Sequence, residues 1–343
     1  MQVAIVGASG YGGAELYRLL QRHPEIEEIH LFAHSQADQP ISAIFPHIGK
    51  EQWVKKFAVQ AVAACAEWVF LATPSGVSAQ VTPQLVEAGL KVIDLSGDLR
   101  LAKPADYEEW YGKTPAPASL LEKAVYGLTE LYRDAVRTAD LIANPGCYPT
   151  ATLLGLAPLL QEGLVETQSV IVDAKSGVSG AGRSSNLTHS FSEVNENLKV
   201  YRVNKHQHIP EIERFASQLA GEPVQISFLT HLIPMTRGMM CTIYATPRRG
   251  LSAEKVHQLY RSYYEDARFV RVRPLGQFPA TKEVYGSNYC DLGVAVDQRT
   301  GRITVVSVID NLVKGAAGQA VQNLNVRMGW PEALSLEGEP LFP

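Results

Sequence analysis

One cysteine of this chain lies in a sequence context that favours a reactive thiol. Cys147 falls in the run Asn144-Pro-Gly-Cys-Tyr-Pro149, where Pro149 is preset for the first turn of a following helix. A thiol at a helix N-terminus sits where backbone dipoles stabilise the thiolate, the form that attacks an electrophile. We therefore expect Cys147 to be a nucleophile, with a purely structural thiol as the alternative. The remaining cysteines lie in or beside apolar runs and are expected to be small core residues: Cys65, Cys241 and Cys290.

A nucleophilic cysteine needs a group that exchanges protons with it. The segment Lys205-His-Gln-His-Ile-Pro-Glu211 offers His206 and His208. A metal pair is the poorer explanation, because no third ligand with recognisable spacing accompanies them, so no metal is expected. From the residues alone, a polar surface segment is as good an explanation as catalysis.

A glycine-rich loop near the start of the chain is typical of a nucleotide site. It follows the apolar run Val3 to Val6 and opens a helical pattern, as a loop that binds phosphate must. The spacing is GxxGxxG and not GxGxxG, so the strand–turn–helix context supports the interpretation, and a tight packing turn is the alternative. The residues expected to contact the nucleotide here are Gly7, Ser9, Gly10, Tyr11, Gly12 and Gly13.

The residues after the second apolar run favour NADP (NADPH) over NAD. That run ends near Ala33, about 20 residues beyond the glycines, where an NAD enzyme usually carries an acid for the ribose 2′-hydroxyl. Here the chain reads His34-Ser35-Gln36, and Asp38 comes late. No carboxylate would repel a 2′-phosphate, and Ser35 can donate to one, although no arginine is present to settle the preference.

The elements that must position these groups alternate in the first half of the chain. Short apolar runs separated by helical patterns are the βαβ rhythm of a parallel, doubly wound sheet. After about residue 165 the runs become longer, and Asp297 to Gly301 is a hairpin signal. The segment Val313 to Met328 returns to helical spacing, and its small residues Gly315 to Gly318 would allow close approach to another backbone or a ligand. We expect this late helix to pack on the first domain, although it could instead cover the second sheet.

The predicted fold class is therefore α/β. The first half is expected to form a Rossmann-like, doubly wound domain, and the part after about residue 165 an α+β domain with a largely antiparallel sheet.

Composition excludes several other classes of protein. The 343 residues suggest two domains, and 31 Lys plus Arg against 35 Asp plus Glu, with no basic run, argue against nucleic acid as a partner. The uncharged stretch Leu141 to Gln161 contains three prolines, so a turn and a buried helix explain it better than a membrane span. No secretory signal and no disulfide pattern are visible, so a cytoplasmic protein with reduced thiols is expected.

The string IANPGCYPTATLLGLAP at 142–158 resembles the active-site motif of the N-acetyl-gamma-glutamyl-phosphate reductase family. Further segments similar to that family lie at 7–20, 70–78, 94–101, 173–183, 206–212 and 286–294. The resemblance implies an NADP-binding domain over residues 1–147 and 312–343 and a catalytic and oligomerisation domain over residues 148–311. It also implies a homo-oligomer, dimer or tetramer, that reduces the small-molecule acyl phosphate N-acetyl-glutamyl 5-phosphate to the 5-semialdehyde in arginine biosynthesis. Aspartate-semialdehyde dehydrogenases, and reductases of carrier-protein-linked glutamyl or aminoadipyl phosphates, are the alternatives within this chemistry.

The resemblance also implies roles for individual residues. It makes Cys147 the nucleophile and His208 the acid and base, and it adds Thr73, Pro74 and Asn311 to the cofactor residues. A substrate with a phosphate and a carboxylate needs cationic groups. The candidates are Arg100, Arg183 and Arg237. A cysteine hydrolase would not need the glycine loop, and a nucleotide-sensing regulator would not need Cys147, so the two features together favour a dehydrogenase.

The missing acid after the second strand gives a first prediction. Ser35→Asp should weaken NADPH binding roughly tenfold or more, because a carboxylate would face the 2′-phosphate at short range. Fluorescence titration with NADPH and NADH measures this, and Ser35→Ala is the control for loss of the hydroxyl alone. Equal affinity of the unmodified protein for the two cofactors would contradict the interpretation.

Overall fold

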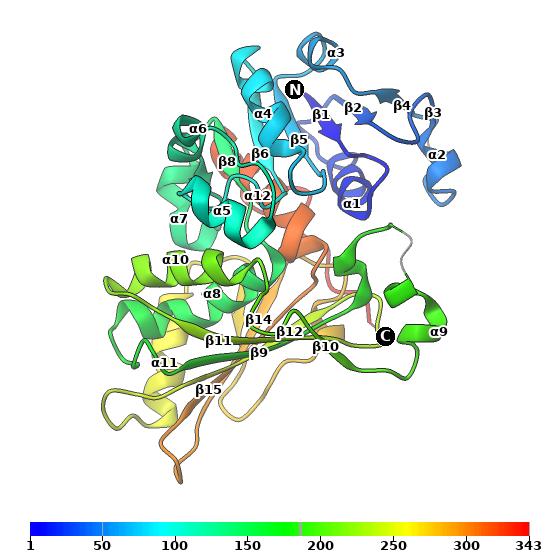
Figure 1. The fold of residues 1–343 in the computed structure, drawn as a ribbon. Helices are drawn as coiled ribbons and strands as arrows, with labels where there is room; N and C mark the ends of the chain where they lie inside the picture. The colour runs from blue at the N-terminus through cyan, green and yellow to red at the C-terminus, as the bar shows by residue number, and fades with distance from the viewer. Residues whose placement is uncertain (50, 185–186, 343) are drawn as a thin grey trace. The chain divides into compact units, whose positions relative to one another are not determined.

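The computed structural model describes residues 1–49, 51–184 and 187–342, and the chain divides into two units (Figure 1). Unit 1 comprises Met1–Gly146 and Ala316–Glu337, and unit 2 comprises Cys147–Gly315 with the tail from Gly338. The predicted boundaries differ in three places. Cys147 and residues 312–315 fall in unit 2, and so does the tail, in which the Leu341 N–H donates to the carbonyl of Tyr285 at 2.8 Å.

The described part of unit 1 is built on an eight-stranded sheet with the order β3-β4-β2-β1-β5-β6-β8-β7. The strands are β1 (Gln2–Val6), β2 (Glu28–Ala33), β3 (Gln39–Pro40), β4 (Trp53–Lys56), β5 (Trp68–Leu71), β6 (Lys91–Asp94), β7 (Val125–Tyr126) and β8 (Leu141–Ala143). All neighbouring strands are parallel except β3 and β4. The prediction of a doubly wound parallel sheet is confirmed.

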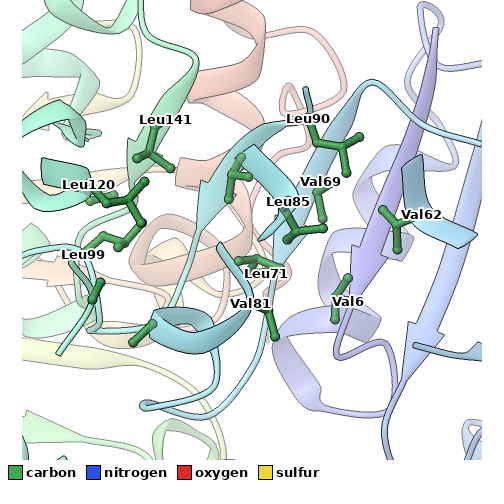
Figure 2. Packing of buried hydrophobic residues seen from close by; sticks show 14 of the residues in the cluster. Val6, Val62, Val69, Leu71, Val81, Leu85, Leu90, Leu99, Leu120 and Leu141 are labelled. Atoms are coloured by element: carbon green, nitrogen blue, oxygen red, sulfur yellow. The ribbon is translucent and has the colours of Figure 1, made fainter. Parts of the chain in front are cut away.

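Helices pack against this sheet and bury its strands. They are α1 (Tyr11–Leu20), α2 (Ile41–Ile44), α3 (Val59–Ala63), α4 (Ser78–Glu87), α5 (Pro104–Tyr111), α6 (Ala118–Lys123), α7 (Thr129–Val136) and α12 (Gly318–Met328). Strand β5 is buried along its whole length, as expected for a parallel strand with apolar cover. Figure 2 shows part of this core, in which Val69 and Leu71 of β5 lie near Leu85 of α4. Helix α12 contacts α1 and α7, so the late helix does pack on the first domain.

Unit 2 is built on a seven-stranded sheet over its described residues, with the order β10-β11-β9-β12-β15-β14-β13. The strands are β9 (Val170–Ser176), β10 (Lys199–Tyr201), β11 (Ile226–Leu232), β12 (Met239–Ala245), β13 (Val270–Val272), β14 (Cys290–Val296) and β15 (Ile303–Ile309). The pairs β9–β11 and β13–β14 are parallel and the others are antiparallel, as the prediction of a largely antiparallel sheet requires. The hairpin signal is also confirmed, since Gly301 N–H donates to the Asp297 carbonyl at 2.7 Å.

Helix α8 (Cys147–Gln161) lies at the centre of unit 2. Residues Tyr148 to Leu160 are all buried, because the helix packs against α10 on one side and against β12 and β15 on another. The uncharged stretch is thus strand β8, a turn and a buried helix, as predicted. The other helical segments of the unit are η1 (Val178–Ala181), η2 (Leu187–His189), α9 (Phe191–Val194), α10 (Ile209–Ala220), α11 (Ala253–Tyr263) and η3 (Thr281–Val284), and the π-helical η4 (Val313–Ala317) runs across the junction of the two units. None of the helices described is both long enough and apolar enough to cross a bilayer.

Strand register aligns several loops at one end of the unit 2 sheet. Ser176 of β9 pairs with Leu232 of β11 and Met239 of β12, and Met239 pairs with Ile309 of β15. The loops at 177–183, 233–238 and 310–315 therefore start or end side by side. This end of the sheet carries the polar residues discussed below.

In unit 1, the segment after β6 supports the neighbouring loop. The Asp98 carboxylate accepts hydrogen bonds from the N–H groups of Gly76 and Ala79, at 2.7 and 2.8 Å, and from the Tyr107 hydroxyl at 2.6 Å. Asp94 accepts from the Ser96 hydroxyl at 2.8 Å and is fully buried. Burial, and then the charge of Asp98, raise the pKa of Asp94 to about 6.

The raised pKa of Asp94 gives a stability prediction with a defined sign. In the unfolded chain this group titrates near ~4, so between pH 4 and about 6 only the folded state holds the proton. The contribution of Asp94 to the free energy of unfolding should therefore decrease as pH rises through this window, by roughly 2–3 kcal/mol. Asp94→Asn should lack this component in urea unfolding between pH 4 and 7. If the free energies of unfolding of the parent protein and Asp94→Asn change with pH in parallel across that range, the raised pKa of Asp94 is wrong.

Candidate active site

The glycine loop of unit 1 has the geometry of a phosphate cradle. Gly7 adopts a left-handed conformation, φ +94°, and a Cβ there would lie 2.3 Å from the carbonyl oxygen of Ala72. Only glycine allows this close approach of the loops after β1 and β5. Helix α1 then begins at Tyr11, and its N-cap residue Gly10 provides no side-chain cap. The first-turn N–H groups and the positive end of the helix dipole suit a pyrophosphate, so the residues present fit a dinucleotide.

The other predicted cofactor residues of unit 1 lie at the same edge of the sheet. Val6 of β1 pairs with Phe32 of β2 and with Leu71 of β5, so the loops that follow these strands are adjacent. Ser35 is exposed just after β2, and Thr73, next to Pro74, lies just after β5 with its hydroxyl 2.9 Å from that of Ser78. Strand order reverses at β1, the position where doubly wound sheets bind ligands.

Asn311 has a different environment from the other predicted cofactor residues. It belongs to unit 2, where its Oδ1 accepts from the Gly238 N–H at 2.8 Å and its Nδ2 donates to the Ser179 hydroxyl at 2.9 Å. Its side chain is buried, and its amide joins two loops at the end of the sheet. Contact of Asn311 with the cofactor stays a prediction.

Unit 2 brings the turn at Cys147 and both candidate histidines into one cluster. Cys147 is the first residue of α8 and is half-buried, as the helix-start prediction required. The ring of the next residue, Tyr148, lies 5.2 Å from that of His206 and 5.9 Å from that of His208, centroid to centroid. The ring of Phe228 lies 5.5 Å from Tyr148 and completes the cluster.

The two histidines differ in their environments. The Nδ1 atom of His206 accepts a hydrogen bond from the His208 backbone N–H at 3.1 Å, so the proton of the neutral ring is on Nε2. Burial, with the charge of Arg202 as a smaller cause, lowers the pKa of His206 to about 3. His206 is therefore a neutral imidazole at physiological pH and holds the backbone from which His208 projects. The structure thus gives His206 and His208 different environments, which the sequence did not distinguish.

Sequence reasoning missed Tyr148 and Phe228 of this cluster, and also Tyr201 and Arg202 beside it. The hydroxyl groups of Tyr148 and Tyr201 lie 2.9 Å apart, and burial raises the pKa of Tyr201 to about 12. Arg202, the next residue, is exposed and adds positive charge near His206. Tyr148 could have been found from its place beside Cys147. Tyr201 and Arg202 carried no signal, because the pairing of β10 with β11 brings them here.

The predicted substrate arginines are in two different settings. In unit 1, Arg100 is buried, and its Nε and Nη2 donate to the carbonyls of Asn144 and Leu95, both at 2.8 Å. These bonds fix the plane of the guanidinium group. In unit 2, Arg183 is exposed, whereas Arg237 lies 3.6 Å from the buried carboxylate of Asp310.

Backbone hydrogen bonds bring the Arg183 and Arg237 loops together. The N–H of Val178 donates to the Met235 carbonyl at 2.9 Å, and that of Ser179 donates to the Thr236 carbonyl at 3.0 Å. Two candidate cations thus lie on joined loops at the end of the unit 2 sheet.

The remaining cysteines contrast with Cys147. Cys241 and Cys290 are buried, as predicted, and burial raises the pKa of Cys241 to about 12. Cys65, near the end of α3, packs against the hydrophobic core of unit 1 but is only half-buried, and burial raises its pKa. Its position just beyond a five-residue helix leaves part of the side chain uncovered. Within the described residues, no group of three His, Cys, Asp or Glu side chains could hold a metal ion.

Comparison with known proteins defines the class. Residues 2–139 match the protein family described as "Semialdehyde dehydrogenase, NAD binding domain", and residues 147–311 match "Semialdehyde dehydrogenase, dimerisation domain". Among solved structures, aspartate semialdehyde dehydrogenase II of Vibrio cholerae, complexed with ASA, aligns with a TM-score of 0.72 at 19% identity, over 96% of this chain and 98% of that one. The enzyme of Candida albicans with NADP aligns with a TM-score of 0.71 at 17% identity, over 95% and 97%. These likenesses establish the fold.

Curated relatives define the family more closely. The chain is 59% identical to a protein of Geobacillus thermodenitrificans (strain NG80-2) named "N-acetyl-gamma-glutamyl-phosphate reductase", over 100% of both chains. A protein of Bacillus subtilis (strain 168) with the same name is 52% identical, also over 100% of both. The chain therefore belongs to the N-acetyl-gamma-glutamyl-phosphate reductase family of the semialdehyde dehydrogenases.

The neutral role of His206 gives a prediction with a conservative rescue. The Oδ1 of asparagine can replace the Nδ1 acceptor, so His206→Asn should keep most of the activity and leave its pH profile between 5 and 8 unshifted. His206→Leu removes the acceptor and leaves the His208 backbone N–H unsatisfied, at a cost of about 1–3 kcal/mol. The segment that carries His208 should then shift, and kcat should fall roughly tenfold or more. Steady-state kinetics across pH measure both. Equal loss in the two variants would contradict the backbone-holding role.

Proposed function

We propose that this chain catalyses the NADPH-dependent reductive dephosphorylation of N-acetyl-L-glutamyl 5-phosphate to N-acetyl-L-glutamate 5-semialdehyde and phosphate, in arginine biosynthesis. The observation that carries this proposal is 59% identity over the whole of both chains to a reductase of that name. The cysteine at the start of α8, its histidine neighbours and the glycine loop are the groups that this reaction needs.

The first step forms a covalent bond to Cys147. The Sγ thiolate attacks the acyl carbon of the substrate, the bond from that carbon to the phosphate oxygen breaks, and phosphate leaves. His208 takes the thiol proton beforehand and so generates the nucleophile. N–H groups in the first turn of α8 are suitable donors to the oxygen that becomes negative. The product of this step is a thioester on Cys147.

The second step is reduction and release. The cofactor would be held by the backbone of the Gly7 to Gly13 loop, by Ser35, and by Thr73 and Pro74, with Asn311 as a further candidate from unit 2. When bound, NADPH supplies the hydride that reduces the acyl carbon. The bond from carbon to Sγ then breaks, the aldehyde leaves, and the Cys147 thiolate recovers its proton from His208. The neutral ring of His206 keeps His208 in place through both steps.

The anionic ends of the substrate require fixed cations. We assign this role to Arg183 and Arg237 in unit 2 and to Arg100 in unit 1. The planar guanidinium of Arg100 is already oriented by two carbonyls, which lowers the entropy cost of binding an oxyanion. The ion pair with the Asp310 carboxylate orients the guanidinium group of Arg237 in the same way.

The assembly and the compartment follow from the same assignment. The family description of residues 147–311 as a dimerisation domain supports a homo-oligomer, either a dimer or a tetramer. None of the four cysteines, all of which the structure describes, forms a disulfide, which fits the reducing cytoplasm. Light scattering after gel filtration measures the mass of the assembly.

The reverse reaction tests the proposed function. NADP should be reduced in the presence of N-acetyl-glutamate 5-semialdehyde only when inorganic phosphate is added, and aspartate semialdehyde should be a poor substrate. Cys147→Ser should abolish the reaction while NADPH binding survives, because a hydroxyl is a far weaker nucleophile. His208→Asn should retain a slower reaction, by roughly 10²-fold or more, with a shifted pH profile. Phosphate-independent turnover, or preference for aspartate semialdehyde, would contradict the proposal.

A further inference from the structure

A π-helical turn lies behind the reactive cysteine. This turn, η4, forms where the sequence places small residues before the last long helix. The N–H of Gly315 donates to the carbonyl of Asp310, five residues earlier, at 3.0 Å, which is the hydrogen bond that defines a π-helix. Such turns are rare and frequently occur at functional sites. The proposed reaction has given this turn no role.

Gly315 has no room for a side chain because of Cys147. A Cβ on Gly315 would lie 2.7 Å from the Cβ of Cys147, 3.2 Å from its Cα and 3.3 Å from the Cδ1 of Ile309. The first distance is shorter than any normal carbon–carbon contact, and the second involves main chain that cannot rotate away. The φ angle of Gly315 is outside the left-handed region, so its backbone would accept alanine. Alanine at position 315 would therefore be opposed by a steric clash with Cys147, and not by the backbone conformation.

The turn that carries Gly315 is fixed by a buried carboxylate. The Oδ1 of Asp310 accepts from the N–H groups of Leu312 and Val313, at 2.8 and 3.1 Å, and its Oδ2 accepts from the Gly286 N–H at 2.8 Å. Arg237 lies 3.6 Å from the same carboxylate, which is fully buried. With this many bonds, the turn cannot easily move to relieve a clash. The strain of an added methyl group would therefore fall on the first turn of α8.

We propose that Gly315 is a positioning residue for the nucleophile. The bare Cα of Gly315 lets α8 begin directly against the π-turn, and this contact sets the position of the Cys147 Cα–Cβ bond and hence of Sγ. The proposal rests on the proposed function only for the identity of the electrophile. The position of the thiol is a property of unit 2 and can be measured without the substrate.

The experiment compares Gly315→Ala with Gly315→Ala/Ile309→Val, with Ile309→Val as the matched control. Two rates are measured: alkylation of Cys147 by iodoacetamide, located by peptide mass spectrometry, and phosphate release on mixing with acyl phosphate in the absence of NADPH. Because a displacement of about 1 Å can cost roughly a hundredfold, we expect the phosphate-release rate of Gly315→Ala to fall by about that factor. We expect the alkylation rate to change as well. NADPH affinity should change little, because most of the proposed cofactor residues belong to unit 1.

The double variant separates the two contacts of the added methyl group. Ile309→Val removes the Cδ1 atom but leaves Cys147 as it is, so it should not restore either rate. Unchanged rates in Gly315→Ala, or full recovery in the double variant, would overturn the proposal. A parent protein that shows no phosphate release would contradict the proposed function, whereas the alkylation rates would still decide the role of Gly315.

A second pair of variants decides the matter if Gly315→Ala does not fold. Cys147→Gly removes the Cβ that the new methyl group would meet. We expect Gly315→Ala to lower the thermal unfolding midpoint in the parent protein, or to prevent folding, and to have little effect in the Cys147→Gly background. An equal effect in both backgrounds, including failure of both to fold, would show that Gly315 does not act through Cys147.

Discussion

The first turn of helix α8 is the constraint on which the candidate active site of unit 2 depends. Cys147 must begin that helix for its thiolate to be stabilised by backbone dipoles, and the helix must be buried for its start to stay fixed. The apolar length of α8 between α10 and the strands β12 and β15 fulfils the second requirement. Burial of an uncharged helix therefore fixes the position of the proposed nucleophile.

Two groups of contacts refine that position. On one side, Tyr148 places its ring against His206 and His208, and the neutral imidazole of His206 holds the backbone of its neighbour. On the other side, the π-turn at Gly315 lies against Cys147 and is held by the buried Asp310. A similar combination of a glycine and a buried carboxylate is found at the sheet edge of unit 1. There Gly7 permits close approach of two loops, and Asp98 accepts hydrogen bonds from one of them.

Sequence reasoning succeeded where a feature is local along the chain. The glycine loop, the helix start at Cys147 and the hairpin at Asp297 each follow from a short run of residues whose conformational preferences agree. It failed where distant strands decide the outcome. Tyr201 reaches the cluster only through the pairing of an edge strand, and no pattern shows that the amide of Asn311 joins two loops. Unit boundaries were missed by a few residues because the π-turn continues across one of them.

Peptide mass spectrometry measures directly whether Cys147 is acylated during the reaction. The protein is mixed with N-acetyl-glutamyl 5-phosphate in the absence of NADPH, quenched in acid, and digested for peptide mapping. We expect one acyl group per chain, located on Cys147, removed by hydroxylamine and absent in Cys147→Ser. An acyl group on any other residue, or undiminished acylation of Cys147→Ser, would contradict the covalent role of Cys147.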